Sequence, residues 1–454
     1  AGMGADLFDS NVAAIAAALV MAASLGVVHV EMVFVFIALG LLSSMLGVGF
    51  SKMGKDGDPT RALNLGTYLT TGFFAAFTAL ATYLLKFEWR IWGAAIVGLL
   101  VGVVIGITTD YFTNDSRKPV RMVSEASKSG PAFTILSGIS YGFLSVLPAM
   151  IGIAISALAS YMLYGMFGVS MAAVGMLSIV GMIVSNDAYG PIVDNARGLA
   201  EMGGLGEDVI EITDKLDSAG NTVKAVTKGF SIGAAGLTVI ALLFAFITEV
   251  NAAAKIIGLA EIKFLDIMDP IVFFGMIIGA AVPAVFSALL MLGVDKNAQR
   301  MVAEIHRQFD EIPGLMEGKE GVEPEYDKCI TIATTGALRE LVPAGLFAIA
   351  LTIIVGFIGG VKAIGGFLAG NIVSGLLISL FMSNSGGLWD NSKKYIEAGN
   401  CGGKGSDAHK AGVVGDTVGD PFKDTAGPSI NTQITVVSLV ATLLAELFLT
   451  LSLF

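Results

Sequence analysis

The sequence predicts an all-α protein, a polytopic bundle of transmembrane helices that forms one domain over residues 1–454. Three observations support this prediction. Hydrophobic residues make up 54% of the chain and charged residues only 14%, whereas soluble proteins carry about 25% charged residues. The apolar residues gather in stretches long enough to cross a bilayer, which takes about 20 residues. The 57 glycines also fit a membrane bundle, because glycine lets helices pack closely.

Eleven stretches have the length and composition of a membrane span. They centre on residues 8–28, 31–50, 66–85, 91–110, 134–160, 167–186, 228–248, 268–292, 335–357, 363–384 and 431–453. Buried helices of a large soluble protein are the alternative interpretation, but eleven such stretches are hard to shield from water.

The segments between the spans alternate between short ones and long polar ones. The long polar segments are 51–65, 110–132, 186–228, 293–340 and 386–428, and they hold 22 of the 27 Lys and Arg residues. Because Lys and Arg collect on the cytoplasmic side of a membrane, we expect these loops in the cytoplasm, with residue 1 inside and residue 454 outside. The net charge of −11 argues against a nucleic-acid partner.

Three polar clusters stand at predicted cytoplasmic ends of spans. In the first, Asp187 and Asp194 are seven residues apart, which places them two turns along one helix face. In the second, Asp390 shares a face with Lys393 and Lys394. The third cluster is a stripe of carboxylates spaced four residues apart, with a lysine beside it: Asp416, Asp420, Asp424 and Lys423.

A stripe of carboxylates on one helix face is self-repulsive unless cations neutralise it. Mg²⁺ binds a few carboxylates together with water and phosphate oxygens, and lysines act as point charges for phosphate. Together the clusters therefore suggest a magnesium–polyphosphate site. The alternative is a solvated helix surface at the membrane boundary, in which the same charges form ion pairs within each helix.

Two further sets of polar residues enter apolar stretches. Asn221, Lys224 and Lys228 fall on one helix face at the start of a span, where charged groups are costly and usually functional. The alternative is that these lysines extend to the lipid headgroups. Asp6 and Asp9 lie one turn apart in the first span and are candidates for an ion path, although they also lie near the chain end.

Several strings of the sequence resemble membrane-bound, ion-translocating pyrophosphatases. They are Gly-Met-Gly-Ala-Asp-Leu-Phe at 2–8, Asp-Ala-Tyr-Gly-Pro-Ile-Val-Asp-Asn-Ala at 187–196, Asp-Asn-Ser-Lys-Lys-Tyr-Ile-Glu at 390–397 and Gly-Asp-Thr-Val-Gly-Asp-Pro-Phe-Lys-Asp-Thr-Ala-Gly-Pro at 415–428. Shorter strings at 124–127 and 307–314 resemble the same family. The resemblance runs along the whole chain.

The resemblance implies a homodimeric protein of sixteen spans in a cell membrane, with the inner membrane of a prokaryotic cell as the expected location. The eleven spans predicted here would then be the sixth to the sixteenth. The preceding part would supply about half of the Mg²⁺ ligands and one of two aspartates that position the attacking water. We expect the complete enzyme to be active and this chain alone to be inactive.

The resemblance also implies a site that binds Mg²⁺ and pyrophosphate and hydrolyses the latter by direct attack of water. Catalysis is assigned to Asp424, Asp194 and Asp420, with Asp424 as a water-positioning aspartate. Substrate binding is assigned to Asn221, Lys228, Lys393, Lys394 and Lys423. The metal ligands expected from the resemblance are Asp194, Asn221, Asp390, Asp416, Asp420 and Asp424.

For ion transport the resemblance implies a proton pump that needs no K⁺. Lys224 with Thr227 resembles the K⁺-independent members, in which a fixed ammonium replaces a potassium ion. Asp6 matches the family's gate aspartate, and Asp9 stands where a glutamate is frequent. Most members carry a gate lysine at the position of Thr435, so the gate of this chain must be built differently, with Glu446 as one possible contributor.

Three other functions stay open on the sequence. The protein could pump Na⁺, because Asp9 beside Asp6 could help to bind it and Thr435 removes a competing ammonium. It could be a secondary transporter that moves an anion without hydrolysis, although such sites usually lie at the membrane midplane. It could also be a non-catalytic remnant.

Overall fold

The computed structural model describes residues 2–53 and 57–454, apart from the side-chain surroundings of positions 2, 3, 60, 218, 221, 222, 224, 225 and 228. Within these residues the chain is helical with no β-strand, so the all-α prediction is confirmed. The helices in chain order are α1 (Gly2–Leu25), α2 (Val27–Phe50), α3 (Pro59–Leu84), α4 (Trp89–Thr113), α5 (Lys118–Ser127), α6 (Pro131–Leu177), α7 (Val180–Met202), α8 (Glu207–Ile257), α9 (Pro270–Glu311), α10 (Tyr326–Glu397), α11 (Asp407–Asp420), α12 (Gly427–Leu443) and α13 (Ala445–Leu451), with a 3₁₀ turn η1 (Asn400–Gly402) and a π-helix η2 (Pro421–Ala426).

The prediction of a polytopic helical membrane protein is confirmed. Among the described residues, seven helices are long and apolar enough to cross a bilayer, or eight if α11–α12 and α13, which meet at a bend of 57°, are counted as one span. The sequence predicted eleven spans. The difference from eight arises because α10 contains two of the predicted spans, because the predicted span 167–186 is divided between α6 and α7, and because α3 is not among the helices that qualify.

The two longest apolar helices are each interrupted at a glycine. Gly165 in α6 has φ 58° and Gly360 in α10 has φ 60°, a backbone conformation that glycine adopts without steric cost. Contacts between α10 and α9 run in opposite senses on the two sides of Gly360. Before it, Gly336 meets Asn297 and Glu340 meets Gly293; after it, Ala363 meets Gly275 and Phe367 meets Gly279. The helix α10 is therefore a tight hairpin of two antiparallel arms.

The predicted span at 167–186 is not one continuous helix. The helix α6 ends at Leu177 and α7 begins at Val180. The interruption coincides with a close approach of α2, because a Cβ atom at Gly40 would lie 2.6 Å from the carbonyl oxygen of Ser178.

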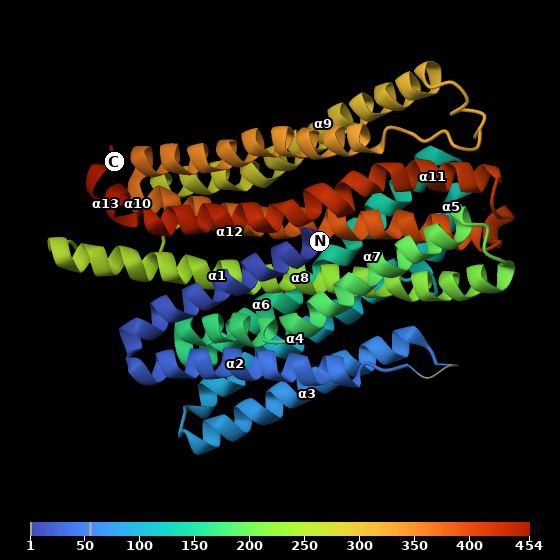
Figure 1. Ribbon diagram of the computed structural model, residues 1–454. Helices are drawn as coiled ribbons and strands as arrows, with labels where there is room; N and C mark the ends of the chain where they lie inside the picture. Colours follow the sequence, from blue (N-terminus) through green and yellow to red (C-terminus); the bar gives the residue numbers. More distant parts are fainter. Residues whose placement is uncertain (1, 54–56) are drawn as a thin grey trace.

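Long helices bring polar segments from distant parts of the sequence to one end of the bundle. Figure 1 shows α5 and α11 at the same end of the molecule, opposite the end that holds α13. The second arm of α10 leads to this end, and α11, η2 and α12 pack along it. The helix α8 combines a polar first part with an apolar span from Gly229 to Ile257.

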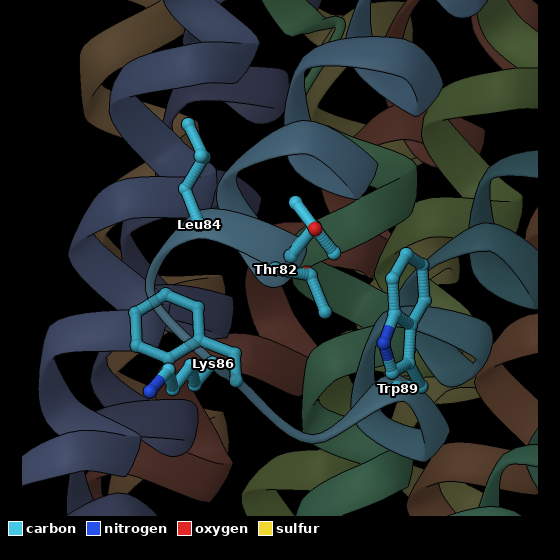
Figure 2. Close-up of a pocket in the computed structure, with 6 residues that line it drawn as sticks. Thr82, Leu84, Lys86 and Trp89 are labelled. Atoms are coloured by element: carbon cyan, nitrogen blue, oxygen red, sulfur yellow. The ribbon is translucent and has the colours of Figure 1, made fainter.

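A hollow of about 550 Å³ lies at the turn between α3 and α4, and Thr82, Leu84, Lys86 and Trp89 are among the residues that line it (Figure 2). It adjoins the first residue of α4, whereas the last residue, Thr113, contacts Asn391 of α10. Given the rise of an α-helix, the two ends of α4 are about 36 Å apart. The hollow is therefore separate from the polar clusters predicted from the sequence.

Candidate active site

The ammonium group of Lys423 lies at the centre of a cluster of four carboxylates. Its Nζ atom is 3.4 Å from Asp390 Oδ2, 3.9 Å from Asp416 Oδ1 and 3.2 Å from Asp424 Oδ2, and it also pairs with Asp420. Lys423 is 9% exposed. Since charged groups are rarely buried unless they are paired, these contacts account for a lysine at this depth.

Two more lysines extend the cluster across neighbouring helices. Lys393 Nζ lies 2.6 Å from Asp416 Oδ2, which connects α10 to α11. Lys394 Nζ lies 3.6 Å from Asp390 Oδ1 and 3.9 Å from Asp217 Oδ2, which connects α10 to α8. Charges of opposite sign therefore alternate from α8 through α10 to α11 and η2.

A change in helix winding brings the carboxylate stripe around Lys423. The helix α11 passes at Pro421 into the π-helix η2, which carries Lys423 and Asp424. Proline has no backbone N–H group and cannot continue the α-helical hydrogen bonding, so it favours a change of winding at this point. π-helical turns occur frequently at functional sites.

Glycines allow α10 to approach α11 and η2 closely. A Cβ atom on Gly386 would lie 2.5 Å from the Cβ of Lys423 and 2.6 Å from the carbonyl oxygen of Gly419. No real Cβ atom tolerates such contacts, so the position requires glycine. The short distance between the backbones is what lets Asp390 and Lys423 meet.

A buried tryptophan next to the cluster packs between α10, α6 and α11. Trp389 has no exposed surface, and its indole Nε1 donates a hydrogen bond of 2.9 Å to the carbonyl oxygen of Thr134 in α6. Its ring packs against Gly138, Gly415 and Gly419. Because Trp389 directly precedes Asp390, its fixed position also fixes the backbone from which the Asp390 side chain extends.

The two shorter strings that resemble the same family each connect neighbouring helices. Ser124 of α5 donates a hydrogen bond of 3.2 Å to the carbonyl oxygen of Ser392, which anchors α5 on the second arm of α10. Arg307 pairs with Glu304, Glu311 and Glu325, which ties the end of α9 to the start of α10.

The structure brings seven of the predicted site residues into one set of contacts. They are Asp390, Lys393, Lys394, Asp416, Asp420, Lys423 and Asp424. The side chains of Asn221, Lys224 and Lys228 lie outside the described residues. Thr227, predicted beside Lys224, is buried in α8.

The first predicted cluster is divided by its surroundings. Asp187 is buried and Asp194 is exposed, although both lie on α7 seven residues apart. The helix periodicity gave them a common face, but the packing differs along that face. Next to Asp194, Val193 is buried against Gly220 of α8, so this turn of α7 does lie beside α8.

The sequence prediction missed Asp217. This aspartate on α8 is 7% exposed and contacts Lys394. Its position four residues before Asn221 on one helix face was the available signal. Tyr189 of α7 donates a hydrogen bond of 3.3 Å to the carbonyl oxygen of Leu216, and burial together with the charge of Asp217 raises the pKa of the Tyr189 hydroxyl.

The charged cluster has the residue types that bind a divalent metal ion. The cluster holds five carboxylates and three ammonium groups, a formal charge of −2, which favours cations. Oxygen donors of this kind suit Mg²⁺, which keeps several water ligands. Within the described part of the chain, however, no three His, Cys, Asp or Glu side chains are arranged to hold a metal directly, since the Lys423 ammonium occupies the space between them. The residue types therefore fit Mg²⁺ bound partly through water.

A second polar site lies inside the bundle around Asp6. This carboxylate is 5% exposed and accepts hydrogen bonds from Ser231 at 2.6 Å, from Asn431 at 3.3 Å and from Thr432 at 3.3 Å. Asp9 is half-buried one turn further along α1. Three helices, α1, α8 and α12, therefore meet at a carboxylate bound by neutral donors.

The other proposed gate residues occupy different surroundings. Thr435 is fully buried, and its hydroxyl has no hydrogen-bond partner among the described residues. Glu446 is exposed on α13. It lies beyond the bend of 57° that separates α13 from α12, the helix of Thr432, and its contribution to the gate stays a prediction.

The fold and these two sites define a class of protein. It is a polytopic helical membrane protein with an alternating cluster of carboxylates and lysines at one end of the bundle and a buried carboxylate inside it. Residues 1–444 match the family described as inorganic H⁺ pyrophosphatase. The chain belongs to this family, whose pumps are energised by pyrophosphate.

Similar proteins carry names that differ in the transported ion. A protein from Clostridium tetani, named as a candidate K⁺-stimulated pyrophosphate-energized sodium pump, is 43% identical over 99% of this chain. K⁺-insensitive pyrophosphate-energized proton pumps from Moorella thermoacetica and Methanosarcina mazei are each 41% identical over 99% of this chain. The chain spans 66% of the Clostridium, 68% of the Moorella and 67% of the Methanosarcina protein.

Proposed function

We propose that the protein is a Mg²⁺-dependent inorganic pyrophosphatase of the membrane that couples hydrolysis to the transport of H⁺ out of the cytoplasm. The observation that carries this proposal is the convergence of Asp390, Asp416, Asp420 and Asp424 on Lys423, with Lys393 and Lys394 beside them. This set offers both charges that a magnesium–pyrophosphate complex requires.

The lysines suit a polyphosphate. Lys393, Lys394 and Lys423 come from two neighbouring segments and share Asp390 and Asp416 as partners. Each ammonium can therefore turn from a carboxylate to a phosphate oxygen without leaving the cluster. Asn221 and Lys228, which follow Asp217 on α8, are proposed to complete the substrate site. Charge stabilisation of this kind is the main contribution of proteins to phosphoryl transfer.

The aspartates are proposed to hold Mg²⁺ and the attacking water. The metal ligands would be Asp194, Asn221, Asp390, Asp416, Asp420 and Asp424, and bound Mg²⁺ would neutralise charge on the phosphoryl oxygens. Asp424, with 54% of its side chain exposed, is the carboxylate proposed to accept a hydrogen bond from the attacking water, with Asp194 and Asp420 as the other catalytic aspartates.

The choice of H⁺ as the transported ion rests on α8 and α1. Lys224 and Thr227 are proposed to replace a potassium ion and so to make the enzyme K⁺-independent. Asp6 and Asp9 of α1 and Thr435 of α12 are proposed to form the gate. A carboxylate surrounded by the neutral donors Ser231, Asn431 and Thr432 can gain and lose a proton without breaking an ion pair among these groups.

A sodium pump is the second candidate. Asp9 adds a second carboxylate close to Asp6, and the position of Thr435 offers a hydroxyl rather than an ammonium. Inverted membrane vesicles supplied with Mg²⁺ and pyrophosphate separate the two candidates. Proton uptake that an uncoupler abolishes and that persists without Na⁺ supports the proton pump, whereas sodium uptake that survives the uncoupler and is abolished by a sodium ionophore supports the second candidate.

Release of phosphate tests the enzymatic step itself. Membranes containing the complete protein, including the part that precedes this chain, should release phosphate from pyrophosphate only when Mg²⁺ is present. Transport of an anion with no release of phosphate would favour the secondary transporter, and the absence of both activities would favour a non-catalytic protein. We further propose that the protein acts as a homodimer and that the Lys423 cluster faces the cytoplasm of a prokaryotic cell.

A further inference from the structure

Asp217 lies at the α8 edge of the charged cluster. It is 7% exposed, and its Oδ2 atom is 3.9 Å from Lys394 Nζ. The same ammonium lies 3.6 Å from Asp390 Oδ1. Lys394 therefore lies between two carboxylates on different helices. The carboxylate of Asp217 attracts the Lys394 ammonium toward α8.

Lys394 needs such a second partner to keep this position. A lysine side chain has a flexible stem of four carbons and presents a point charge with no fixed direction. Asp390, its first partner, is shared with Lys423 at 3.4 Å. Without Asp217 the Lys394 ammonium would compete with Lys423 for Asp390, and both ammonium groups would move toward the same carboxylate.

The backbone that carries Asp217 is held firmly against α7. Tyr189 donates its hydroxyl to the carbonyl oxygen of Leu216 at 3.3 Å, one residue before Asp217. One turn later a Cβ atom on Gly220 would lie 2.8 Å from Val193 Cγ2, which shows how closely the two helices approach. The carboxylate of Asp217 is therefore a fixed point from which a flexible lysine can be directed.

We propose that Asp217 is a positioning residue that holds Lys394 across the gap between α8 and α10, where the ammonium meets a phosphate oxygen of the substrate. This inference rests on the proposed function, because it names a further residue of the same pyrophosphate site. Asp217 acts through Lys394 and does not itself touch the substrate.

The test is a double-mutant cycle on the complete protein in detergent, with magnesium imidodiphosphate, a pyrophosphate analogue that resists hydrolysis, as the probe. We expect Asp217→Asn to raise the Kd about tenfold, since it removes the negative charge that pairs with Lys394. In a Lys394→Ala background the same substitution should have almost no effect, because the group that Asp217 positions is already gone. Asp217→Glu, which keeps the charge, should recover most of the affinity.

Three results would overturn the proposal. An unchanged or lower Kd for Asp217→Asn would mean that Asp217 contributes only negative charge. Equal effects in both backgrounds would mean that it supports the fold rather than Lys394. If Asp217→Asn does not fold, a Kd for Asp217→Glu as weak as that of Lys394→Ala would contradict the role.

A control on the same helix is available. Asp214 is paired with Arg197 at 2.7 Å on the exposed side of α8, and Asp214→Asn should leave the Kd for the analogue unchanged. If the unmodified protein failed to bind magnesium imidodiphosphate at all, the proposed function would fail first. If it bound and Asp217→Asn bound equally well, only the role of Asp217 would be lost.

Discussion

Lys423 Nζ lies 3.4 Å from Asp390 Oδ2, although the lysine belongs to the π-helix η2 and the aspartate to α10. Asp416, Asp420 and Asp424 surround the same ammonium. Four carboxylates around one buried cation make Lys423 the electrostatic centre of the site, since without it they would repel one another.

Lys423→Met should both destabilise the protein and abolish hydrolysis. Removing one partner from a buried set of charges leaves the others uncompensated, which costs about 3–5 kcal/mol. We expect a lower midpoint of thermal unfolding in Mg²⁺-free buffer and a rate of phosphate release at least about 100-fold lower. Added Mg²⁺ should raise the midpoint more in the variant than in the unmodified protein.

Lys410→Met is the matched control for this change. Lys410 pairs with Asp407 at 3.0 Å in an exposed position on α11, where an ion pair contributes little. An equal loss of stability in Lys410→Met and Lys423→Met would contradict the central role of Lys423.

Gly386→Ala should disrupt the site without changing any charge. The new methyl group would lie 2.5 Å from Lys423 Cβ and 2.6 Å from the carbonyl oxygen of Gly419, so α10 must move away from η2. Overpacking of this kind costs about 1–3 kcal/mol, and we expect phosphate release to fall at least about tenfold. Gly345→Ala, also in α10, meets no atom within 4 Å and should retain full activity.

Asp424→Asn should abolish hydrolysis while the protein still inserts into the membrane and forms the proposed dimer. The substitution keeps the shape of the side chain but removes the charge that polarises the attacking water, an effect worth about 100-fold to 10,000-fold in rate. Phosphate release measures the loss, and size-exclusion chromatography measures the assembly. Substantial hydrolysis by Asp424→Asn would exclude this residue from the water site.

Lys224→Ala should make hydrolysis dependent on K⁺. Without the proposed fixed ammonium, a potassium ion would be required to supply the same charge. Phosphate release is measured with and without KCl at constant ionic strength, with NaCl as the comparison salt. Equal activity of Lys224→Ala in the absence and presence of KCl would refute the role of Lys224.

The helical class and most of the charged cluster could be predicted from the sequence because each depends on local spacing. Apolar stretches identify spans, and a four-residue period places Asp416, Asp420 and Asp424 on adjacent turns. Periodicity was less informative where packing changes along a helix. It placed Asp187 and Asp194 on one face but did not indicate that the first is buried and the second exposed.

Contacts between segments distant in sequence could not be predicted in the same way. Asp217 was missed because its partner, Lys394, lies on another helix, and nothing in the local sequence around Asp217 identifies a lysine so far along the chain. The hairpin at Gly360 was expected only as a gap between two spans, whereas its positive φ is a property of the folded backbone.

The amino-acid sequence by itself determined that this protein is a bundle of membrane helices with acidic and basic residues gathered at span ends, because hydropathy and charge act along the chain. Only the tertiary structure decided that Asp390, Asp416, Asp420 and Asp424 share one ammonium and that Asp6 meets Ser231, Asn431 and Thr432. These meetings depend on how closely glycine-lined helices pack and on a π-helical turn at Pro421, which are settled in three dimensions.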